Sequence, residues 1–285
     1  MRHGDNGMQR PGAISRRIWL AAVVAPVIAW SAASAQSQPA SPCATATEED
    51  RIQVVLEAGE IRLQRLGLVR LADIRLIETE DTAPPLAWLR SLSGSRVQVA
   101  AGRPDRWQRR RAVLALADEA APIDIGELLV GEGFAMVDAG EEDELCRPAL
   151  LGVEQRARDR RLGAWRADPM PLLRADDTPV AHQIGRFAIV EGRILSVGER
   201  ATRTYLNFGR AGTGALTVTL PKRTWSILRG RGLSAEGLRG CRVRVRGMIE
   251  MWRAPTMEVV AADTLELLDA KPGPRAGATP DAQRP

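Results

Sequence analysis

Short runs in which apolar and polar residues alternate are the feature that most restricts how this chain can fold. Such alternation occurs at Ile61-Arg62-Leu63 and again at Leu68-Val69-Arg70-Leu71, with Gly67 between the two runs. A repeat of two residues puts every second side chain on the same face of a strand, whereas a helix repeats about every 3.6 residues. The two runs therefore predict a hairpin, and similar runs further along predict a mainly β fold with helices, of the α+β class.

Residues 50–167 form the first expected domain. Its elements follow the order strands, helix, strands and two helices, which suits a small closed barrel with helices packed on it. Beyond the hairpin, the expected strands cover 96–100 and 112–117, and the expected helices cover 84–92, 125–131 and 148–162. Gly163 is expected to end the last helix.

Residues 185–269 form a second strand-rich domain, after a linker at 168–184 that is rich in proline and aspartate. A helix is expected after the third of five strands, which is the order of an OB-like β-barrel, although a generic five-stranded barrel fits almost as well. Residues 270–285 are expected to be a disordered tail. The expected strands cover 187–197, 204–208, 216–220, 241–251 and 257–260, and the helix lies near 224–228.

The first 35 residues are typical of a secretory signal peptide. An apolar run from Ile18 to Trp30 follows Arg16-Arg17, and the segment ends at Ala33-Ser34-Ala35, where cleavage is expected. The paired arginines are also found in twin-arginine signals, so either that route or the general secretory route is open. Residues 36–49 would then be a flexible lead-in. We expect a periplasmic or secreted protein with no membrane span in the mature chain.

Export permits disulfide bonds, so the three cysteines can be paired in more than one way. Cys43 and Cys146 stand near the two ends of the first domain, and a bridge between them would close a loop of about 100 residues. In the chain-entropy model such a loop stabilises the fold by roughly 4 to 5 kcal/mol. The alternative is that all three are buried thiols. Cys241 lies inside an expected strand and is interpreted as a core residue.

The charged residues favour an anionic partner. The net charge is +5, and the excess is arginine, whose guanidinium group donates paired hydrogen bonds to anions. A solvated basic surface explains the same excess equally well. There are two histidines; His3 lies in the expected signal peptide, which leaves His182. Zinc sites built on histidine and Ser/His/Asp triads are therefore not expected.

Six short stretches of the first domain follow one another in a recognisable order, and they resemble the thermonuclease family, whose members are staphylococcal nuclease-like. The family pattern is Asp-Gly-Asp-Thr, an arginine-bearing strand, Gly-Ile-Asp-Thr-Pro-Glu, Asp-Arg-Tyr-Gly-Arg, a glycine-alanine stretch and Gly-Leu-Trp. The resemblance covers residues 50–166 and implies an OB-fold barrel with packed helices. The stretches that carry it here are 57–60, 69–71, 73–78, 105–109, 129–135 and 162–165.

The resemblance implies a catalytic set of Arg70, Glu78 and Arg109. In the family two arginines bind the phosphate and a glutamate acts as general base, and these three residues stand at the matching positions. Together they make chemical sense, because guanidinium donors follow charge on phosphate oxygens and a carboxylate can orient or deprotonate water. Alone, each has a plainer interpretation as part of a solvated strand face or the cap of a turn.

The calcium-ligand positions depart from the family pattern. Gly59 and Arg75 stand where the resemblance implies the two ligand carboxylates. Glycine offers no side-chain oxygen and arginine brings a cation, whereas calcium takes six to eight oxygen ligands. We expect Arg75 to join Arg70 and Arg109 in binding phosphate. No cofactor is expected, unless Glu57 rescues a calcium site from the strand face that it should share with Gly59.

Glu60 is expected on the opposite face of that strand.

Two further stretches have the composition of nucleic-acid contacts. Trp107 to Arg111 joins an indole to arginines and would stack a base, or it is a solvated loop. Arg242, Arg244 and Arg246 alternate with valines and should share one sheet face. With Trp252 and Arg253, that face is either a binding surface or the outside of a structural barrel.

The expected function is that of an exported thermonuclease-like protein that binds DNA, RNA or another phosphodiester polyanion, with calcium-dependent hydrolysis weakened or lost. One alternative is an active periplasmic nuclease with an altered metal site. Another is a non-catalytic structural or protein-interaction module.

Overall fold

The computed structural model describes residues 47–77, 83–117, 121–167, 172–175, 178–210 and 213–269. All of these residues belong to one compact unit, Ala40–Pro285. The expected signal peptide, most of the lead-in and the tail at 270–285 lie outside the described residues, as do Cys43 and Glu78. Among the helices that the structure describes, none combines the length and the apolar character needed to cross a membrane.

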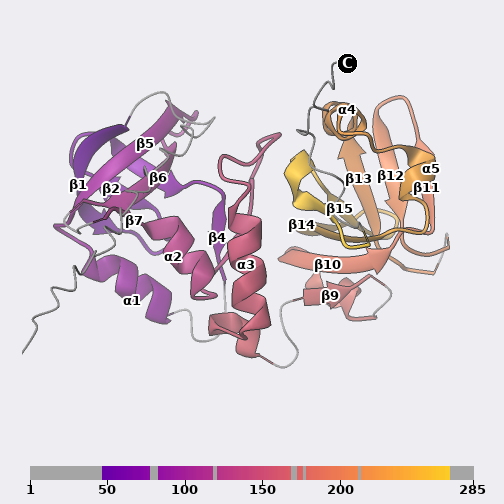
Figure 1. Cartoon of the computed structure of the whole chain (residues 1–285), viewed down its shortest axis with the longest axis horizontal. Helices are drawn as coiled ribbons and strands as arrows, with labels where there is room; N and C mark the ends of the chain where they lie inside the picture. The colour runs from indigo at the N-terminus through magenta and orange to yellow at the C-terminus, as the bar shows by residue number, and fades with distance from the viewer. Residues whose placement is uncertain are drawn as a thin grey trace, which may run out of the picture. The chain divides into compact units, whose positions relative to one another are not determined.

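Five strands of the N-terminal part close into a barrel (Figure 1). β1 (Thr47–Val55) pairs antiparallel with β2 (Ile61–Leu63) and with β5 (Arg96–Pro104). β3 (Gly67–Leu71) continues antiparallel from β2, and β6 (Arg110–Leu116) does so from β5. The parallel pairing of β3 with β6 closes the barrel. This closed five-stranded barrel is consistent with the expected OB-like architecture.

Alternating burial explains why these segments form strands. Ile61 and Leu63 are buried in the barrel while Arg62 between them is exposed, and Val69 is buried beside exposed Arg70. Each large apolar side chain that is removed from water contributes about 1.5 to 3 kcal/mol. The predicted hairpin is confirmed by the antiparallel pairing of β2 with β3.

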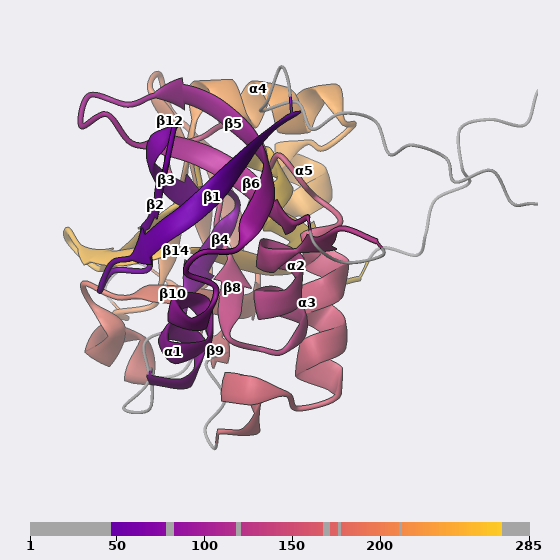
Figure 2. The same ribbon diagram turned by 90° about the vertical axis from the view of Figure 1, so that its left-hand side faces the viewer.

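Helices and short strands surround this barrel. The helix predicted at 125–131 is confirmed with the same bounds, and Asp124 caps it by accepting a hydrogen bond of 2.9 Å from Glu127 N. α2 and α3 lie side by side (Figure 2). The elements are β4 (Ile74–Leu76), α1 (Ala83–Ser91), β7 (Ile123–Asp124), α2 (Ile125–Gly131), β8 (Ala135–Val137), α3 (Leu150–Asp159) and the 3-10 helix η1 (Gly163–Arg166).

The prediction that Gly163 ends the last helix was wrong, because α3 ends at Asp159. Arg161 takes a left-handed conformation with φ 53°. Its N–H donates to Arg158 O at 3.0 Å, and Leu162 N donates to Ala157 O at 3.0 Å. These two bonds form a Schellman motif, which stops a helix even when an arginine takes the place of the usual glycine.

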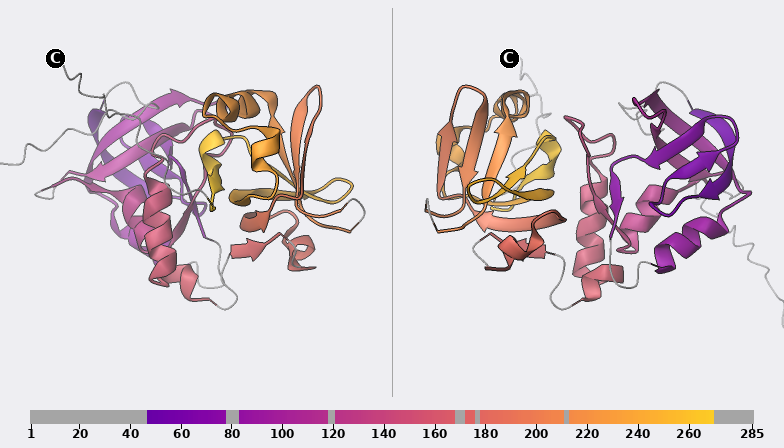
Figure 3. Two further views of the ribbon diagram at one scale, coloured as in Figure 1. Left: turned by 45° about the vertical axis from the view of Figure 1, so that its right-hand side comes forward. Right: turned by 180° about the vertical axis from the view of Figure 1, so that it is seen from behind.

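The second barrel repeats the strand pairing of the first. β11 pairs antiparallel with β12, β12 with β13, β15 with β14 and β14 with β10, whereas β13 and β15 pair parallel. The helix α4 follows the third strand, as predicted, and covers one end of this barrel (Figure 3). The elements are β10 (Phe187–Arg193), β11 (Ser196–Glu199), β12 (Arg203–Asn207), β13 (Thr217–Pro221), α4 (Lys222–Gly230), α5 (Ala235–Leu238), β14 (Arg242–Met251), β15 (Pro255–Glu258), the 3-10 helix η3 (Ala262–Thr264) and β16 (Leu265–Leu267).

Three segments differ from the expected pattern. The strand expected at 187–197 is broken at residues 194–195, so that β10 pairs with β14 and β11 pairs with β12. Part of the expected linker is structured, because β9 (Leu172–Arg174) pairs parallel with β10 and the 3-10 helix η2 (Thr178–Gln183) follows it. β1 begins at Thr47, inside the expected lead-in.

A buried ionic cluster joins α3 to the second barrel and corrects the interpretation of the β14 arginines. Arg246 is 3% exposed and Arg244 is 8% exposed, so neither belongs to a free binding face. Arg246 Nη1 donates to Glu154 Oε2 at 2.8 Å, and its Nη2 donates to Glu266 Oε1 at 2.5 Å. Arg244 Nη1 donates to Gln155 Oε1 at 2.8 Å. The arginines share a face because the strand alternates, and α3 covers that face at Arg244 and Arg246.

Candidate functional site

A tight turn between β1 and β2 forms one wall of the candidate site. Leu56 N donates to Glu60 O at 2.8 Å, and Gly59 N donates to Leu56 O at 3.0 Å. Gly59 has φ 79°, a left-handed conformation that favours glycine. Glu57 and Glu60 both line the same cavity. The expectation that Glu60 points away was wrong, because residues 56–60 form a turn, where strand alternation does not apply.

This cavity has a volume of about 240 Å³ and contains two of the three predicted phosphate-binding arginines. Arg70 reaches it from β3 and Arg75 from β4, opposite the turn that carries the two glutamates. We call it the arginine cavity. Arg70 is exposed and has no ion-pair partner among the described residues. The cavity therefore presents one unpaired guanidinium group to solvent.

Arg75 is held in place by two contacts. Its Nε donates to Asp138 Oδ2 at 2.8 Å, and its guanidinium carbon lies 5.0 Å from the centre of the Phe187 ring. The Arg75 side chain keeps 40% of its surface exposed. The ion pair and the ring orient Arg75 while leaving donors free toward the cavity.

Arg109, the third predicted arginine, contacts the wall of the cavity. Its Nη1 donates to Glu60 Oε1 and its Nε to Asp105 Oδ2, both at 3.0 Å. Although desolvation opposes the shift, the hydrogen bonds and charges of Asp105 and Glu60 raise the pKa of Arg109. The arginine stays charged, and a phosphate would compete with Glu60 for its donors.

The β5–β6 hairpin places Trp107 beside Arg109. Trp107 is 55% exposed. The guanidinium carbons of Arg106 and Arg109 lie 3.8 and 4.7 Å from its ring centre. Asp105 shapes the hairpin by accepting hydrogen bonds from Trp107 N at 2.8 Å and Arg109 N at 2.9 Å. Desolvation would raise the pKa of Asp105, but these bonds lower it overall, so the carboxylate remains ionised.

The other arginines of the 107–111 stretch face elsewhere. Arg110 Nη1 donates to Gly102 O at 3.0 Å, and Arg111 Nη2 donates to Asp73 Oδ1 at 2.8 Å. Of the arginines in this stretch, Arg109 therefore contacts the cavity wall while Arg110 and Arg111 bond to other parts of the barrel. The predicted pairing of an exposed indole with arginines is present at Arg106, Trp107 and Arg109.

Asp73 is a supporting residue that the sequence interpretation missed. It is buried, with φ 60°, directly before β4. Its carboxylate accepts hydrogen bonds from Arg111 Nη2 at 2.8 Å and Arg147 N at 2.6 Å. Burial raises the pKa of Asp73, although hydrogen bonds from Cys146 and Arg147 and the charge of Arg111 act to lower it. The sequence contained one indication that Asp73 is unusual. It stands at the glycine position of the family pattern, where a positive φ is easily adopted.

The residues of the arginine cavity do not fit a calcium ion. Calcium takes six to eight oxygen ligands, and the cavity offers two carboxylates, of which Glu60 is already paired with Arg109. A Cβ atom on Gly59 would lie 2.7 Å from Leu76 Cδ1, so an aspartate is crowded there as well as strained. Over the described ranges, no group of three or more His, Cys, Asp or Glu is placed to hold a metal ion.

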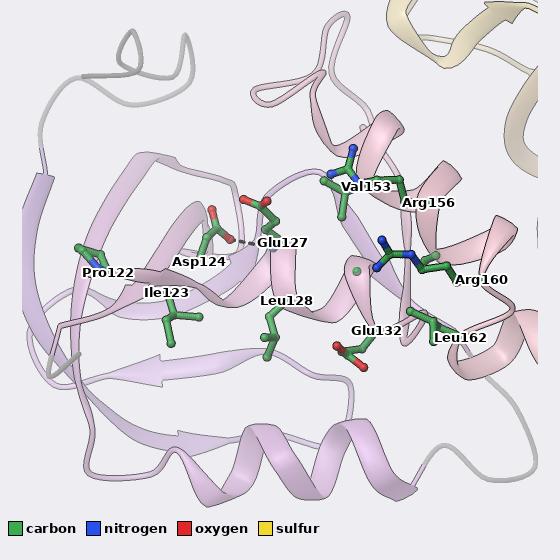
Figure 4. Close-up of a pocket in the computed structure, with 12 residues that line it drawn as sticks. Pro122, Ile123, Asp124, Glu127, Leu128, Glu132, Val153, Arg156, Arg160 and Leu162 are labelled. Atoms are coloured by element: carbon green, nitrogen blue, oxygen red, sulfur yellow. Dashed lines mark hydrogen bonds between the residues drawn. The ribbon is translucent and has the colours of Figure 1, made fainter. Parts of the chain in front are cut away.

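A larger cavity of about 460 Å³ lies between α2 and α3, and none of the predicted site residues that the structure describes lines it (Figure 4). Glu127 and Glu132 line one side and Arg156 and Arg160 the other. Opposite charges that face each other across a groove can neutralise one another by rotation of their side chains. We therefore assign no function to this cavity.

The cysteines separate into two kinds. Cys146 is disulfide-bonded, whereas Cys241 is a free thiol whose Sγ donates to Gly237 O at 3.0 Å. Cys43, the expected partner of Cys146, lies outside the described residues, so their pairing stays a prediction.

Comparison with known proteins adds no assignment to this geometry. No protein-family model matches the chain, and no curated protein matches it.

Proposed function

We propose that this chain is an exported, thermonuclease-like protein that binds DNA, RNA or another phosphodiester polyanion at the arginine cavity, and that its calcium-dependent hydrolysis is weakened or lost. The observation that supports this most directly is the convergence of Arg70, Arg75 and Arg109. Arg70 and Arg75 line the cavity, and Arg109 contacts Glu60 on its wall. The closed barrel with packed helices is compatible with the staphylococcal nuclease-like fold that the resemblance implies.

In this proposal the polyanion backbone lies at Arg70 and Arg75. Arg70 forms no ion pair with a carboxylate of the described residues, so its paired donors are available to phosphate oxygens. Arg109 exchanges Glu60 for a second phosphate, and the exposed ring of Trp107 stacks on a base beside it. Base stacking on an aromatic ring contributes about 1 to 3 kcal/mol and tolerates any base, which suits binding without sequence preference.

Weak hydrolysis follows from the same residues. Arg75 supplies positive charge where the resemblance implies a calcium ligand, so a divalent cation there would be repelled. A guanidinium group neutralises phosphate charge but does not lower the pKa of a bound water as a metal ion does. Binding is therefore retained in this proposal while water activation is impaired.

One observation favours a second candidate, an active nuclease with an altered metal site. Glu57 and Glu60 both line the cavity, which puts two carboxylates near Arg70 and Arg75. If Glu60 left Arg109 to bind a metal ion, the cavity would hold part of a ligand set. Cleavage of plasmid DNA and RNA with calcium, magnesium, manganese or a chelator tests this. Activity that needs a metal and disappears in Glu60→Gln supports the second candidate.

The first proposal is tested by the affinity of the Arg70→Ala variant for DNA and RNA. Arg229→Ala is the matched control, because Arg229 is exposed on α4 and has no ion pair in the described part of the chain. Fluorescence anisotropy with a labelled oligonucleotide at low salt should show about tenfold weaker binding for Arg70→Ala and little change for Arg229→Ala. Equal affinity of the two variants would exclude the arginine cavity as the polyanion site.

The third possibility, a protein-interaction module, makes a different prediction. Polyanion binding falls steeply and linearly with the logarithm of salt concentration, because bound phosphates release counterions. Binding to a protein partner through an apolar surface has no such slope.

A further inference from the structure

A second cavity rich in arginine lies on the C-terminal barrel. Its volume is about 320 Å³, and its lining includes Arg174, Arg193 and Arg242 together with Glu191 and Phe208. We call it the second-barrel cavity. None of these residues lines the arginine cavity of the first barrel, and Arg242 lies at the opposite end of β14 from Trp252.

Strand register fixes the three arginines beside one another. Arg174 is on β9 and pairs in register with Glu191 of β10, while Arg193 of β10 lies directly opposite Arg242 of β14. Two like charges directly opposite on antiparallel strands destabilise the pairing. Asp269 and Glu191 offset part of that repulsion, because each contacts one of the two arginines. A bound anion would offset more of it, so the arrangement points toward a ligand of negative charge.

Arg174 is the clearest free donor in this cavity. It is exposed, and within the ranges that the structure describes it forms no ion pair. Arg174 is the last residue of strand β9, so the strand backbone fixes the point from which its side chain extends. Its guanidinium group is therefore available to an incoming anion without first breaking an internal contact.

The carboxylates near the cavity do not balance its positive charge. Glu191 accepts a hydrogen bond of 2.9 Å from Arg244 Nε through its Oε1, and its Oε2 lies 3.5 Å from Arg242 Nη2. Asp269 lies 3.3 Å from Arg193 Nη1 in a pair whose side chains are 61% and 40% exposed. Such exposed pairs are weak. Glu191 is thus divided between Arg242 and Arg244, and Asp269 pairs weakly with Arg193, so the two carboxylates offset the three cavity arginines only in part.

Gly192 and Phe208 shape the remaining wall. A Cβ atom on Gly192 would lie 2.5 Å from Phe208 Cδ1 and 2.5 Å from Ala175 Cβ. Glycine therefore lets the ring pack directly against strand β10 at the cavity. The result is a small pocket with an aromatic surface beside a group of guanidinium donors, and its volume is at the low end of the range for small-molecule sites.

We propose that the second-barrel cavity binds a phosphomonoester group, either of a free nucleotide or at the end of a nucleic-acid strand. A terminal phosphate carries more charge than a phosphodiester and presents three oxygens, which matches donors that converge from β9, β10 and β14. The cavity has the size for a small group and not for a continuous strand. This site is independent of the function proposed for the arginine cavity.

Isothermal titration calorimetry on the full chain tests the proposal with adenosine 5′-monophosphate, inorganic phosphate and adenosine as probes. We expect saturable binding of the two phosphates at low salt, weakening as salt is added, and no binding of adenosine. Arg174→Ala should weaken phosphate binding at least about tenfold. Arg174→Lys should weaken it by less, because lysine keeps the positive charge but lacks the paired donors of the guanidinium group.

Arg229→Ala is the control, because it removes an equal charge from the same barrel; it should bind adenosine 5′-monophosphate as the natural chain does. Arg174 makes no ion pair in the described chain, so circular dichroism should show an unchanged fold for Arg174→Ala. Absence of saturable phosphate binding, or equal binding by Arg174→Ala, would overturn the proposal.

The two sources of the phosphate are distinguished with one oligonucleotide prepared with and without a 5′-phosphate. A preference for the phosphorylated strand that disappears in Arg174→Ala identifies a strand end as the ligand. Binding of adenosine 5′-monophosphate without any such preference identifies a free nucleotide.

Discussion

At the scale of single residues, the competition between Glu60 and phosphate for Arg109 decides how well the arginine cavity binds anions. The Arg109–Glu60 pair joins Nη1 and Oε1 at 3.0 Å, with side chains that are 23% and 19% exposed. Over the ranges that the structure describes, Arg70 forms no ion pair of this kind. Arg109, which would bind phosphate, is therefore restrained by Glu60 on the wall of the same cavity.

Glu60→Gln is expected to increase polyanion affinity by roughly three- to tenfold, because it releases Arg109 and removes a negative charge from the cavity. Glu236→Gln is the control, since Glu236 is exposed on α5 and forms no ion pair among the residues described. Anisotropy titrations with the same oligonucleotide compare the two variants. A loss of affinity in Glu60→Gln would instead favour a carboxylate that holds a metal ion.

Asp73 gives a pH dependence whose sign follows from its raised pKa. Burial raises that pKa above its ordinary value of 3.8, so the folded state binds a proton more tightly than the unfolded state. Asp73 therefore stabilises most below pH 3.8, and this contribution is lost as pH rises through the folded pKa. The Asp73→Asn variant has no carboxyl group to titrate at this position, so it does not lose this stabilisation as pH rises. Urea unfolding between pH 4 and 8 should show the stability of Asp73→Asn rising relative to the natural chain as pH increases; a relative fall would mean that the pKa is lowered.

At the scale of elements, the β1–β2 turn explains why aspartate cannot simply be restored at position 59. Gly59 and Gly67 share φ 79°, but a Cβ atom would meet Leu76 only at Gly59; at Gly67 nothing lies within 4 Å. Replacement of Gly59 therefore changes both the backbone and the packing of Leu76. The double variant Gly59→Asp, Arg75→Asp would restore both carboxylates of the family pattern. It would also incur the backbone strain and the crowding of Leu76 at position 59.

Gly59→Ala should destabilise the fold more than Gly67→Ala does. Both substitutions impose a left-handed conformation on alanine, which costs about 1 to 2 kcal/mol, and only the first also crowds Leu76. Urea denaturation of the two variants measures the difference, and Leu76→Ala in the Gly59→Ala background should recover part of it. Equal destabilisation by the two glycine substitutions would show that Leu76 adapts without cost.

Periodicity predicted the elements that obey local rules. The helix at 125–131 has an aspartate cap and buried residues at helical spacing, and the β2–β3 hairpin alternates cleanly, so both were predictable. The end of α3 depends on Arg161 in a conformation that arginine rarely adopts. β9 is three residues long, and its pairing with β10 depends on contacts distant in sequence, which no local pattern reports.

The candidate site was predictable to a similar extent. Arg70, Arg75 and Arg109 were identified from their positions in a family pattern, and the structure brings them to one cavity and its wall. Asp105, which holds Arg109, stood in the matched stretch 105–109 but was given no role. Asp138, which holds Arg75, was missed because a carboxylate in a loop has no characteristic spacing. Glu60 was misplaced because the segment was treated as a strand.

At the scale of the whole molecule, the buried cluster around Glu154 links α3 to the second barrel. Glu154 accepts hydrogen bonds from Arg246, Arg158 and Val137 N. Although burial opposes the shift, the charges of Glu154 and Glu266 raise the pKa of Arg246. The valines of β14 fill the interior of the second barrel, and Arg244 and Arg246 on the other face of the strand contact α3. The alternation along β14 therefore supplies both the barrel core and the contact with α3.

Glu154→Ala should destabilise the chain by about 3 to 5 kcal/mol, because it leaves two buried arginines, Arg158 and Arg246, without the carboxylate that they share. The double variant Glu154→Met, Arg246→Met should cost less than Glu154→Ala, since Arg158 is then the one buried arginine of this pair that has lost the Glu154 carboxylate. Glu48→Gln is the control, because the Glu48–Arg65 pair is exposed and weak. Chemical denaturation measures all three, and a cost below 1 kcal/mol for Glu154→Ala would contradict a structural role for the cluster.

The central claim is that Arg70 and its neighbours bind the backbone of a polyanion, and the salt dependence of binding tests it most directly. Affinity for a single-stranded oligonucleotide should fall linearly with the logarithm of salt concentration, and Arg70→Ala should reduce the slope by about one relative to the natural chain and to Arg229→Ala. A slope and affinity that do not change in Arg70→Ala would contradict the claim.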